Sequence, residues 1–83
     1  MNLLIISPEG KKTYTVAWVK AETPQGALTI HPEHAPLIVT LRENSELVFQ
    51  LTTEEEHSLL VHRSGFLEVD RKHVIVLLNQ AIE

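Results

Sequence analysis

Hydrophobic and polar residues alternate with a period of two along much of this chain, which is the pattern of half-buried β-strands. In residues 46–51, Leu47, Phe49 and Leu51 fall on one face and the residues between them fall on the other. Residues 13–22 are rich in Thr, Val, Tyr and Trp, which favour strands. Helical spacing is not sustained anywhere in the sequence, so we expect no helix of two turns or more.

Turn-forming residues divide the chain into short segments. Pro and Gly mark turns at residues 7–10 and 23–26, and residues 52–56 form a polar hairpin tip. A further tight turn is expected at residues 70–72. The expected strands are residues 3–6, 13–22, 27–30, 37–41, 46–51, 58–63, 65–69 and 74–78. About eight to ten short strands at such spacing predict an all-β fold, an antiparallel β-sandwich formed by residues 1–83 as a single domain.

Two of the expected strands, residues 3–6 and 74–78, are apolar on both faces. Central strands of a sandwich have this pattern, and so does a surface that is covered by an obligate partner. Trp18 would share a face with Tyr14 and Val16. We expect that face to be the core, with an interface as the alternative.

Composition and charge exclude several classes of function. The chain of 83 residues has no cysteine, which rules out disulfides and thiolate metal sites. The net charge is −4 and the seven Lys and Arg residues are scattered, so no nucleic-acid partner is expected. No apolar run reaches the roughly 20 residues that span a bilayer, and the N-terminus lacks a basic signal-peptide region. Any membrane association would then occur through a protein partner.

Candidate chemistry is sparse. Of the five histidines, His31 and His34 stand three residues apart in a proline-containing loop, whereas zinc requires three or four converging ligands. We expect no metal site. Residues 54–56 are adjacent glutamates on a turn and resemble a solvated tip more than an acid–base pair. No nucleophile elbow or Gly-rich phosphate loop occurs, so we expect no catalytic residue and no cofactor.

Three further residues have structural interpretations. Glu68 is expected to face outward and to pair with Arg63 or Lys72 across the sheet. Gly26 is expected to occupy a turn position with positive φ. Gly65 is expected to form a bulge or to permit close approach of another strand.

Two motifs carry a family resemblance. Residues 27–38 read Ala-Leu-Thr-Ile-His-Pro-Glu-His-Ala-Pro-Leu-Ile, and residues 64–69 read Ser-Gly-Phe-Leu-Glu-Val. In this order and at this spacing they resemble the β-sandwich domain of the epsilon subunit of F-type ATP synthases. The resemblance covers roughly residues 3–76. Both motifs are architectural, so the resemblance implies a fold and an assembly rather than a binding chemistry.

The resemblance implies a non-catalytic rotor subunit of a proton-translocating F-type ATP synthase, in the central stalk. Such a subunit joins the gamma subunit to the c-ring within a hetero-oligomer. It lies peripherally on the cytoplasmic face of the bacterial inner membrane, without inserting into it. The residues implied as partner contacts are Pro24, Gln25, Gly26, Ala27, His31, His34, Leu37, Ile38 and Thr40.

Within this set, the resemblance places residues 23–27 toward the ring and residues 34–40 toward gamma. Many relatives carry an acidic residue where Ala27 stands, so the polar contact to the ring differs here. His34 is the usual histidine before Ala-Pro in the family. Its ring is expected to brace the loop by a hydrogen bond to a backbone carbonyl, to contact the neighbouring rotor subunit, or to do both.

Longer family members continue into a C-terminal helical hairpin that inhibits rotation, and we expect a natural short form without it. A domain cut from a longer chain is the alternative. Another class of function is an unrelated β-sandwich protein-binding module, although one Trp, one Tyr and two Phe provide little for an aromatic platform. A small enzyme ranks third because no catalytic constellation is present.

Overall fold

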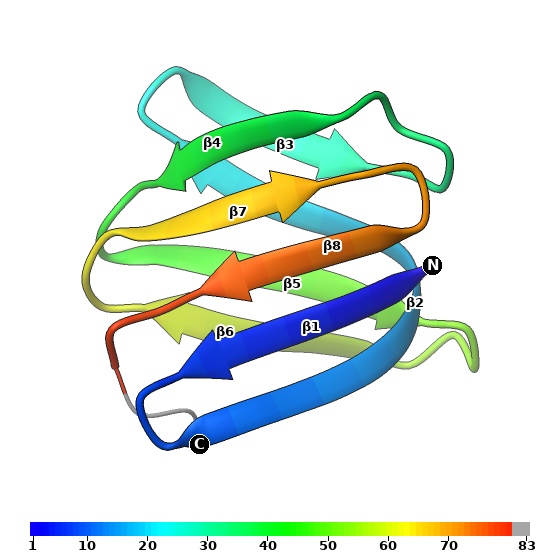
Figure 1. The fold of residues 1–83 in the computed structure, drawn as a ribbon, viewed down its shortest axis with the longest axis horizontal. Helices are drawn as coiled ribbons and strands as arrows, with labels where there is room; N and C mark the ends of the chain where they lie inside the picture. The colour runs from blue at the N-terminus through cyan, green and yellow to red at the C-terminus, as the bar shows by residue number, and fades with distance from the viewer. Residues whose placement is uncertain (81–83) are drawn as a thin grey trace.

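The strands of this protein form two layers packed face to face in a computed structural model that describes residues 1–80 (Figure 1). Eight strands and no helix lie in this part of the chain, which confirms the expected all-β sandwich. The strands are β1 (Asn2–Ser7), β2 (Gly10–Thr23), β3 (Gly26–Ile30), β4 (Leu37–Leu41), β5 (Ser45–Leu51), β6 (Glu56–Val61), β7 (Gly65–Val69) and β8 (His73–Leu77).

Hydrogen bonding joins the strands in the order β4-β7-β8-β1-β2-β5-β6, and β3 pairs with the second half of β2. Strands β1 and β8 are parallel, as their arrows in Figure 1 show. The other pairs within residues 1–80 are antiparallel, as expected. The expectation of an antiparallel sheet is therefore wrong for one pair. Alternation along one strand reports which side is buried and carries no information about the direction of its neighbour.

The long strand β2 belongs to both layers. Its first half pairs with β1 and its second half pairs with β3 and β5. The register slips between Val16 and Trp18, so one extra residue is accommodated where the strand passes from layer to layer. Val16 and Val19 are both buried, whereas Trp18 between them is half-buried. The prediction that Trp18 shares a core face with Tyr14 and Val16 is wrong, because the bulge reverses the alternation.

The core lies between the two layers and is aliphatic apart from Phe49 at its margin. Its largest fully buried side chains are Leu3, Ile5, Val16, Val19, Ile30, Leu41, Leu47, Val61, Leu67, Val69, Val74 and Val76. Each full burial of such a side chain contributes roughly 1.5–3 kcal/mol, most of which is offset by the entropy of ordering the chain. The layers are thereby held as one rigid body without disulfides.

Turn geometry explains where strand ends differ from expectation. Glu54 has a φ of 74° and its N–H donates to the Leu51 carbonyl, 2.9 Å away, so the hairpin tip closes early. Strand β6 therefore begins at Glu56 and includes polar residues that were expected in the tip. Gly26 has a φ of 126°, which confirms the expected positive φ in that turn.

Candidate functional site

The turn between β2 and β3 is one of the two expected contact regions, and a threonine holds it in shape. The Thr23 hydroxyl donates to the Gly26 carbonyl (2.9 Å) and accepts from the Gln25 N–H (3.2 Å). Pro24, Gln25 and Ala27 are exposed at one end of the sandwich. The turn is therefore a fixed, uncharged projection.

The loop between β3 and β4 carries the second region and is tied internally. The His34 N–H donates to the His31 carbonyl (3.2 Å), and His34 Nδ1 donates to the Ala35 carbonyl (2.8 Å). The second bond confirms the expected bracing role of the His34 ring. The Glu33 N–H also donates to the Arg71 carbonyl (3.3 Å), which joins this loop to the β7–β8 turn.

These two regions do not form one site. Strand β3 separates them, so His31 and His34 lie at the opposite end of that strand from the β2–β3 turn (Figure 1). Strand β4 adds contact candidates that divide by face. Ile38 and Thr40 point outward, whereas Leu37 is half-buried toward the interior.

A shallow cavity of about 270 Å³ brings Leu37 together with the turn residues. It lies between β3 and β4, which are not neighbours in the strand order and leave a seam between the layers. One part of it is lined by the turn residues Thr23, Gln25, Gly26 and Ala27. The apolar part is lined by Leu28, Leu37 and Val39. The sequence did not indicate this cavity, because β3 and β4 contribute to it from different layers.

The outer face of the β4-β7-β8-β1 layer is apolar. In the register, Phe66 lies opposite Leu77 and Leu77 opposite Ile6. One row further along, Ile75 lies opposite Leu4. Together with Ile38 on β4, these residues form a patch that we call the outer apolar patch: Leu4, Ile6, Ile38, Phe66, Ile75 and Leu77.

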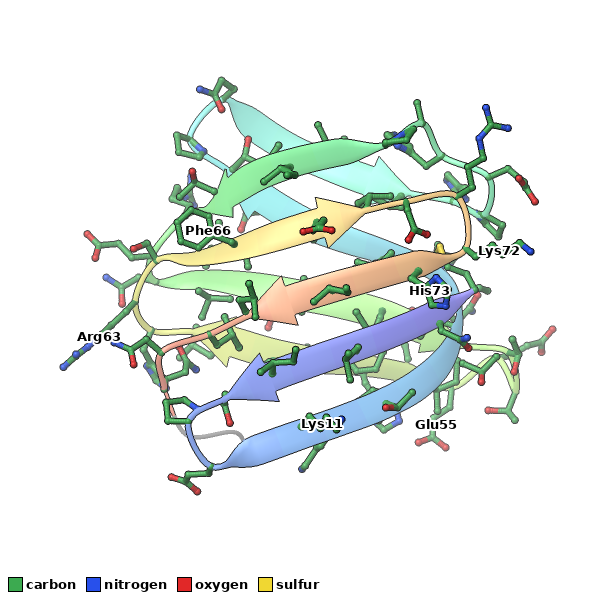
Figure 2. All side chains as sticks on the ribbon, in the orientation of Figure 1. Lys11, Glu55, Arg63, Phe66, Lys72 and His73 are labelled. Atoms are coloured by element: carbon green, nitrogen blue, oxygen red, sulfur yellow. The ribbon has the colours of Figure 1, made fainter. Side chains whose placement is uncertain are left out.

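Three residues of this patch are exposed, and Leu4, Ile6 and Ile75 are half-buried. Ile38 is 70% exposed, Phe66 55% and Leu77 41%. Figure 2 shows Phe66 on the solvent side of β7. Reasoning from sequence named Ile38 but missed Phe66 and Leu77. The sequence signal for this patch was that residues 3–6 and 74–78 are apolar on both faces.

Glu68 interrupts the patch between Ile38 and Ile75. It is exposed, as expected, but forms no ion pair with Arg63 or Lys72 within residues 1–80. Lys11 lies opposite Ile6 at another margin. The patch is thus mostly apolar, with one carboxylate, Glu68, within it and one cation, Lys11, at its margin. Apolar surface with a few charges is typical of protein-binding surfaces.

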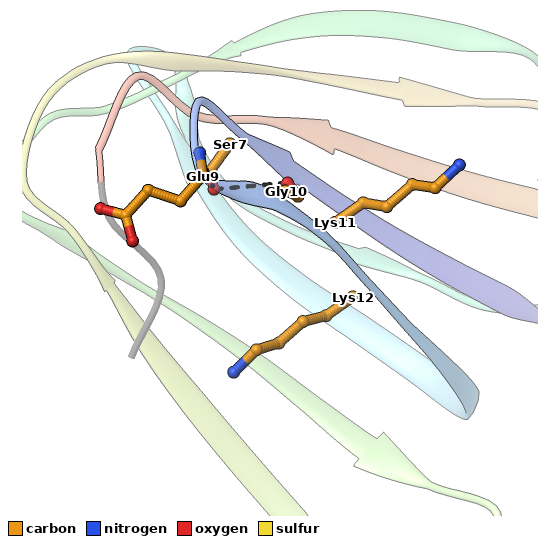
Figure 3. A pocket seen from close by; sticks show the side chains of 5 residues that line it. All are labelled: Ser7, Glu9, Gly10, Lys11 and Lys12. Atoms are coloured by element: carbon orange, nitrogen blue, oxygen red, sulfur yellow. Dashed lines mark hydrogen bonds between the residues drawn. The ribbon is translucent and has the colours of Figure 1, made fainter.

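A second cavity, of about 210 Å³, lies at the β1–β2 turn (Figure 3). The Ser7 hydroxyl donates to the Gly10 carbonyl there (3.4 Å). The Lys11 and Lys12 side chains point away from one another in Figure 3. Without convergent cations this cavity offers no anion site.

Titratable groups give no catalytic arrangement in the described part of the chain. The Asp70 carboxylate accepts backbone N–H bonds from Lys72 and His73, which lower the pKa of Asp70. His57 lies 2.6 Å from a Glu55 carboxylate oxygen on the surface. No group of three or more potential metal ligands comes together within residues 1–80. The same residues contain no helix long and apolar enough to cross a membrane.

Comparison with known proteins agrees with this geometry. The family described as "ATP synthase, Delta/Epsilon chain, beta-sandwich domain" matches residues 1–83. An ATP synthase epsilon chain of Corynebacterium urealyticum is 37% identical over 68 residues, which are 82% of this chain and 54% of that protein.

Two solved structures share the fold. A chain of the Euglena gracilis mitochondrial ATP synthase, solved with OSCP, F1 and the c-ring, superposes with a TM-score of 0.86 at 17% identity. A chain of the Tetrahymena thermophila mitochondrial ATP synthase central stalk and c-ring superposes with a TM-score of 0.80 at 14% identity. In each case 96% of this chain is covered, against 51% and 63% of those chains.

The fold and the surface together define a β-sandwich domain with one apolar outer face. The chain belongs to the family of ATP synthase delta and epsilon chains, whose β-sandwich domain it matches from end to end. This membership excludes the alternative of an unrelated β-sandwich module. The chain spans about half the length of the Corynebacterium urealyticum epsilon chain.

Proposed function

We propose that this chain serves as the β-sandwich of the epsilon subunit of a proton-translocating F-type ATP synthase. In this role it is a non-catalytic rotor component that joins the gamma subunit to the c-ring. Family membership supports the assignment, as do the names of the relatives. The observation that carries the proposal is the outer apolar patch, because a solvated domain gains nothing from an apolar strand face that no partner covers.

The gamma subunit is the proposed partner of the outer apolar patch. Ile38, Phe66 and Leu77 stand on three adjacent strands of one rigid layer. They are 41–70% exposed, so covering them contributes a corresponding share of the roughly 1.5–3 kcal/mol that full burial of such a side chain provides. A few such residues at the centre of an interface can dominate its energy. Thr40 lies opposite Phe66 on the same face and belongs to this proposed contact.

The c-ring is the proposed partner of the β2–β3 turn. Thr23 fixes the turn through two hydrogen bonds, so little conformational entropy is lost on docking. Ala27 leaves the turn without a charge at this position. The adjoining cavity, with Leu28, Leu37 and Val39 in its wall, suits an apolar side chain from the ring.

Localisation and regulation follow from the same proposal. The chain associates with the cytoplasmic face of the bacterial inner membrane through these partners. Residues 1–80 contain strands and turns but no helix. A polypeptide of residues 1–83 is therefore proposed to support rotor assembly without the inhibition that a C-terminal helical hairpin exerts.

Binding of the chain to purified gamma subunit tests the assignment of the patch. Phe66→Glu places a carboxylate in the patch and is expected to weaken binding at least tenfold. Thr29→Glu is the matched control, since it adds the same charge on an exposed strand position of the other layer. Equal binding by Phe66→Glu and the parent chain would contradict the proposed gamma contact.

A further inference from the structure

One end of strand β6 is hydrogen-bonded to a side chain rather than to another strand. β6 pairs with β5 on one side and is last in the strand order. On its other side, Gln80 Nε2 donates to the Leu60 carbonyl and the His62 N–H donates to Gln80 Oε1, both at 2.8 Å. The amide of Gln80 thus makes the pair of bonds that a neighbouring strand would make.

The segment that carries Gln80 is anchored at its start. Leu78 is 5% exposed, and its N–H donates to the Ile6 carbonyl at 2.9 Å. The chain then passes from the layer of β8 and β1 to the edge of β6, where Gln80 is half-buried. The segment is therefore anchored at Leu78, and the two amide bonds hold Gln80 against the edge of β6.

The outward groups of β6 extend beyond the two that Gln80 occupies. Backbone groups of alternate residues point to the same side of a strand. Because the Leu60 carbonyl points away from β5, the N–H and carbonyl groups of Ser58 and Glu56 point away from it as well. A row of such groups is a template for another strand.

Charge along β6 makes this edge complementary to itself. Glu55 and Glu56 stand at its beginning, and His62 and Arg63 stand just past its end. Figure 2 shows Glu55 and Arg63 at opposite sides of the molecule. In an antiparallel pair of two copies with Ser58 opposite Leu60, Glu56 faces His62 and Glu55 faces Arg63 of the other copy. The Glu55–Arg63 contact joins opposite charges, which favours the pairing.

We propose that Gln80 protects the edge of β6 and prevents it from pairing with β6 of a second copy of this chain. In the paired arrangement, the Leu60 carbonyl and the His62 N–H are needed for bonds between copies, and Gln80 occupies both. The inference concerns the free chain and is independent of the proposed role in ATP synthase.

Sedimentation velocity over a concentration series tests whether Gln80 prevents dimerisation. The parent chain is expected to remain at its monomer mass of 9.4 kDa, and Gln80→Ala is expected to shift to twice that mass as its concentration rises. Asn79→Ala is the matched control, because Asn79 is exposed and adjacent, and it should remain monomeric. Gln80→Glu should dimerise more weakly than Gln80→Ala, since a carboxylate still accepts from the His62 N–H but cannot donate to the Leu60 carbonyl.

A second substitution shows whether β6 forms the contact. Ser58→Pro removes an outward N–H without breaking the ladder to β5, so Gln80→Ala/Ser58→Pro is expected to return to monomer. Added salt should weaken the dimer, because its charge pairs are exposed. Three results would each overturn the proposal. The parent chain could dimerise, Gln80→Ala and Gln80→Glu could both stay folded and monomeric, or the dimer could survive Ser58→Pro.

Discussion

The indole Nε1–H of Trp18 donates a hydrogen bond to Oε1 of Gln50, 3.0 Å away on the neighbouring strand β5. This pair lies outside the core, because the bulge after Val16 turns Trp18 to the other side of β2. The bulge lies where β2 leaves one layer for the other. The bond therefore stabilises the strand just past its bend, on the outer face of the second layer.

Trp18→Phe is expected to be a mild substitution. It removes one half-buried hydrogen bond and should lower the free energy of unfolding by about 0.5–1.5 kcal/mol. Leu47→Ala, at a fully buried position, should cost about 2–5 kcal/mol. Urea denaturation of both variants measures the difference. Equal losses would place Trp18 in the core and contradict the structure.

Gly65→Ala is expected to destabilise the β7–β8 pair. A Cβ at this position would lie 2.5 Å from the Leu77 carbonyl oxygen and 2.8 Å from a Leu78 methyl carbon. This geometry confirms the expected close approach at Gly65. Relief of the overlap requires movement of backbone, so a loss of about 1–3 kcal/mol is expected. Thermal melts measure this loss. In them Ser64→Ala, at the exposed neighbouring position, should be nearly neutral, and a neutral Gly65→Ala would refute the contact.

The two loop histidines are expected to differ in their effect on stability. His34→Ala removes the ring bond to the Ala35 carbonyl and should cost about 0.5–1.5 kcal/mol. His31→Ala removes an exposed ring and should change little, since the His31 backbone carbonyl still accepts from His34. Thermal melts with and without a chelator check this ranking. A drop in the parent protein on chelation would show that a metal site had been missed.

Acid should weaken the β7–β8 turn through Asp70. Backbone N–H bonds lower the pKa of Asp70 below its ordinary value of 3.8, and the bond from Lys72 contributes more than the bond from His73. A carboxylate whose pKa falls on folding stabilises the protein above its unfolded pKa, and this stabilisation is lost as the pH falls through the folded pKa. The parent chain should lose more stability than Asp70→Asn below about pH 4. Parallel urea curves at each pH measure this difference, which should be zero if Asp70 does not cap the turn.

Sequence reasoning succeeded where a single strand carries the whole signal. Alternation at residues 46–51 and the turn chemistry around Gly26 predicted local structure that the molecule adopts. The brace by His34 was also predictable, because a histidine held in a proline loop has a carbonyl within reach.

The errors arise where two strands or two layers determine the outcome. The bulge at Trp18 follows from the bend of β2 between layers, and the parallel pairing of β1 with β8 follows from the order of the whole sheet. The outer apolar patch needs the registers of three strand pairs, β4–β7, β7–β8 and β1–β8, before its residues become neighbours. The contact of Gln80 with β6 joins residues 18 and 20 positions apart in the chain, without any periodic signal.

This sandwich is proposed to be a rotor component, with gamma on the outer apolar patch and the c-ring at the β2–β3 turn. The absence of native cysteine allows a single cysteine to be introduced and labelled with a photo-cross-linker without background. Ile38→Cys and Ala27→Cys probe the two surfaces, and Ser58→Cys on the edge of β6 serves as the control.

Cross-linking of these three variants in the assembled ATP synthase tests the claim most directly. We expect adducts of Ile38→Cys with the gamma subunit, adducts of Ala27→Cys with subunit c, and neither adduct from Ser58→Cys. Failure of the chain to assemble with the complex, or an exchange of the two adducts between Ile38→Cys and Ala27→Cys, would contradict it.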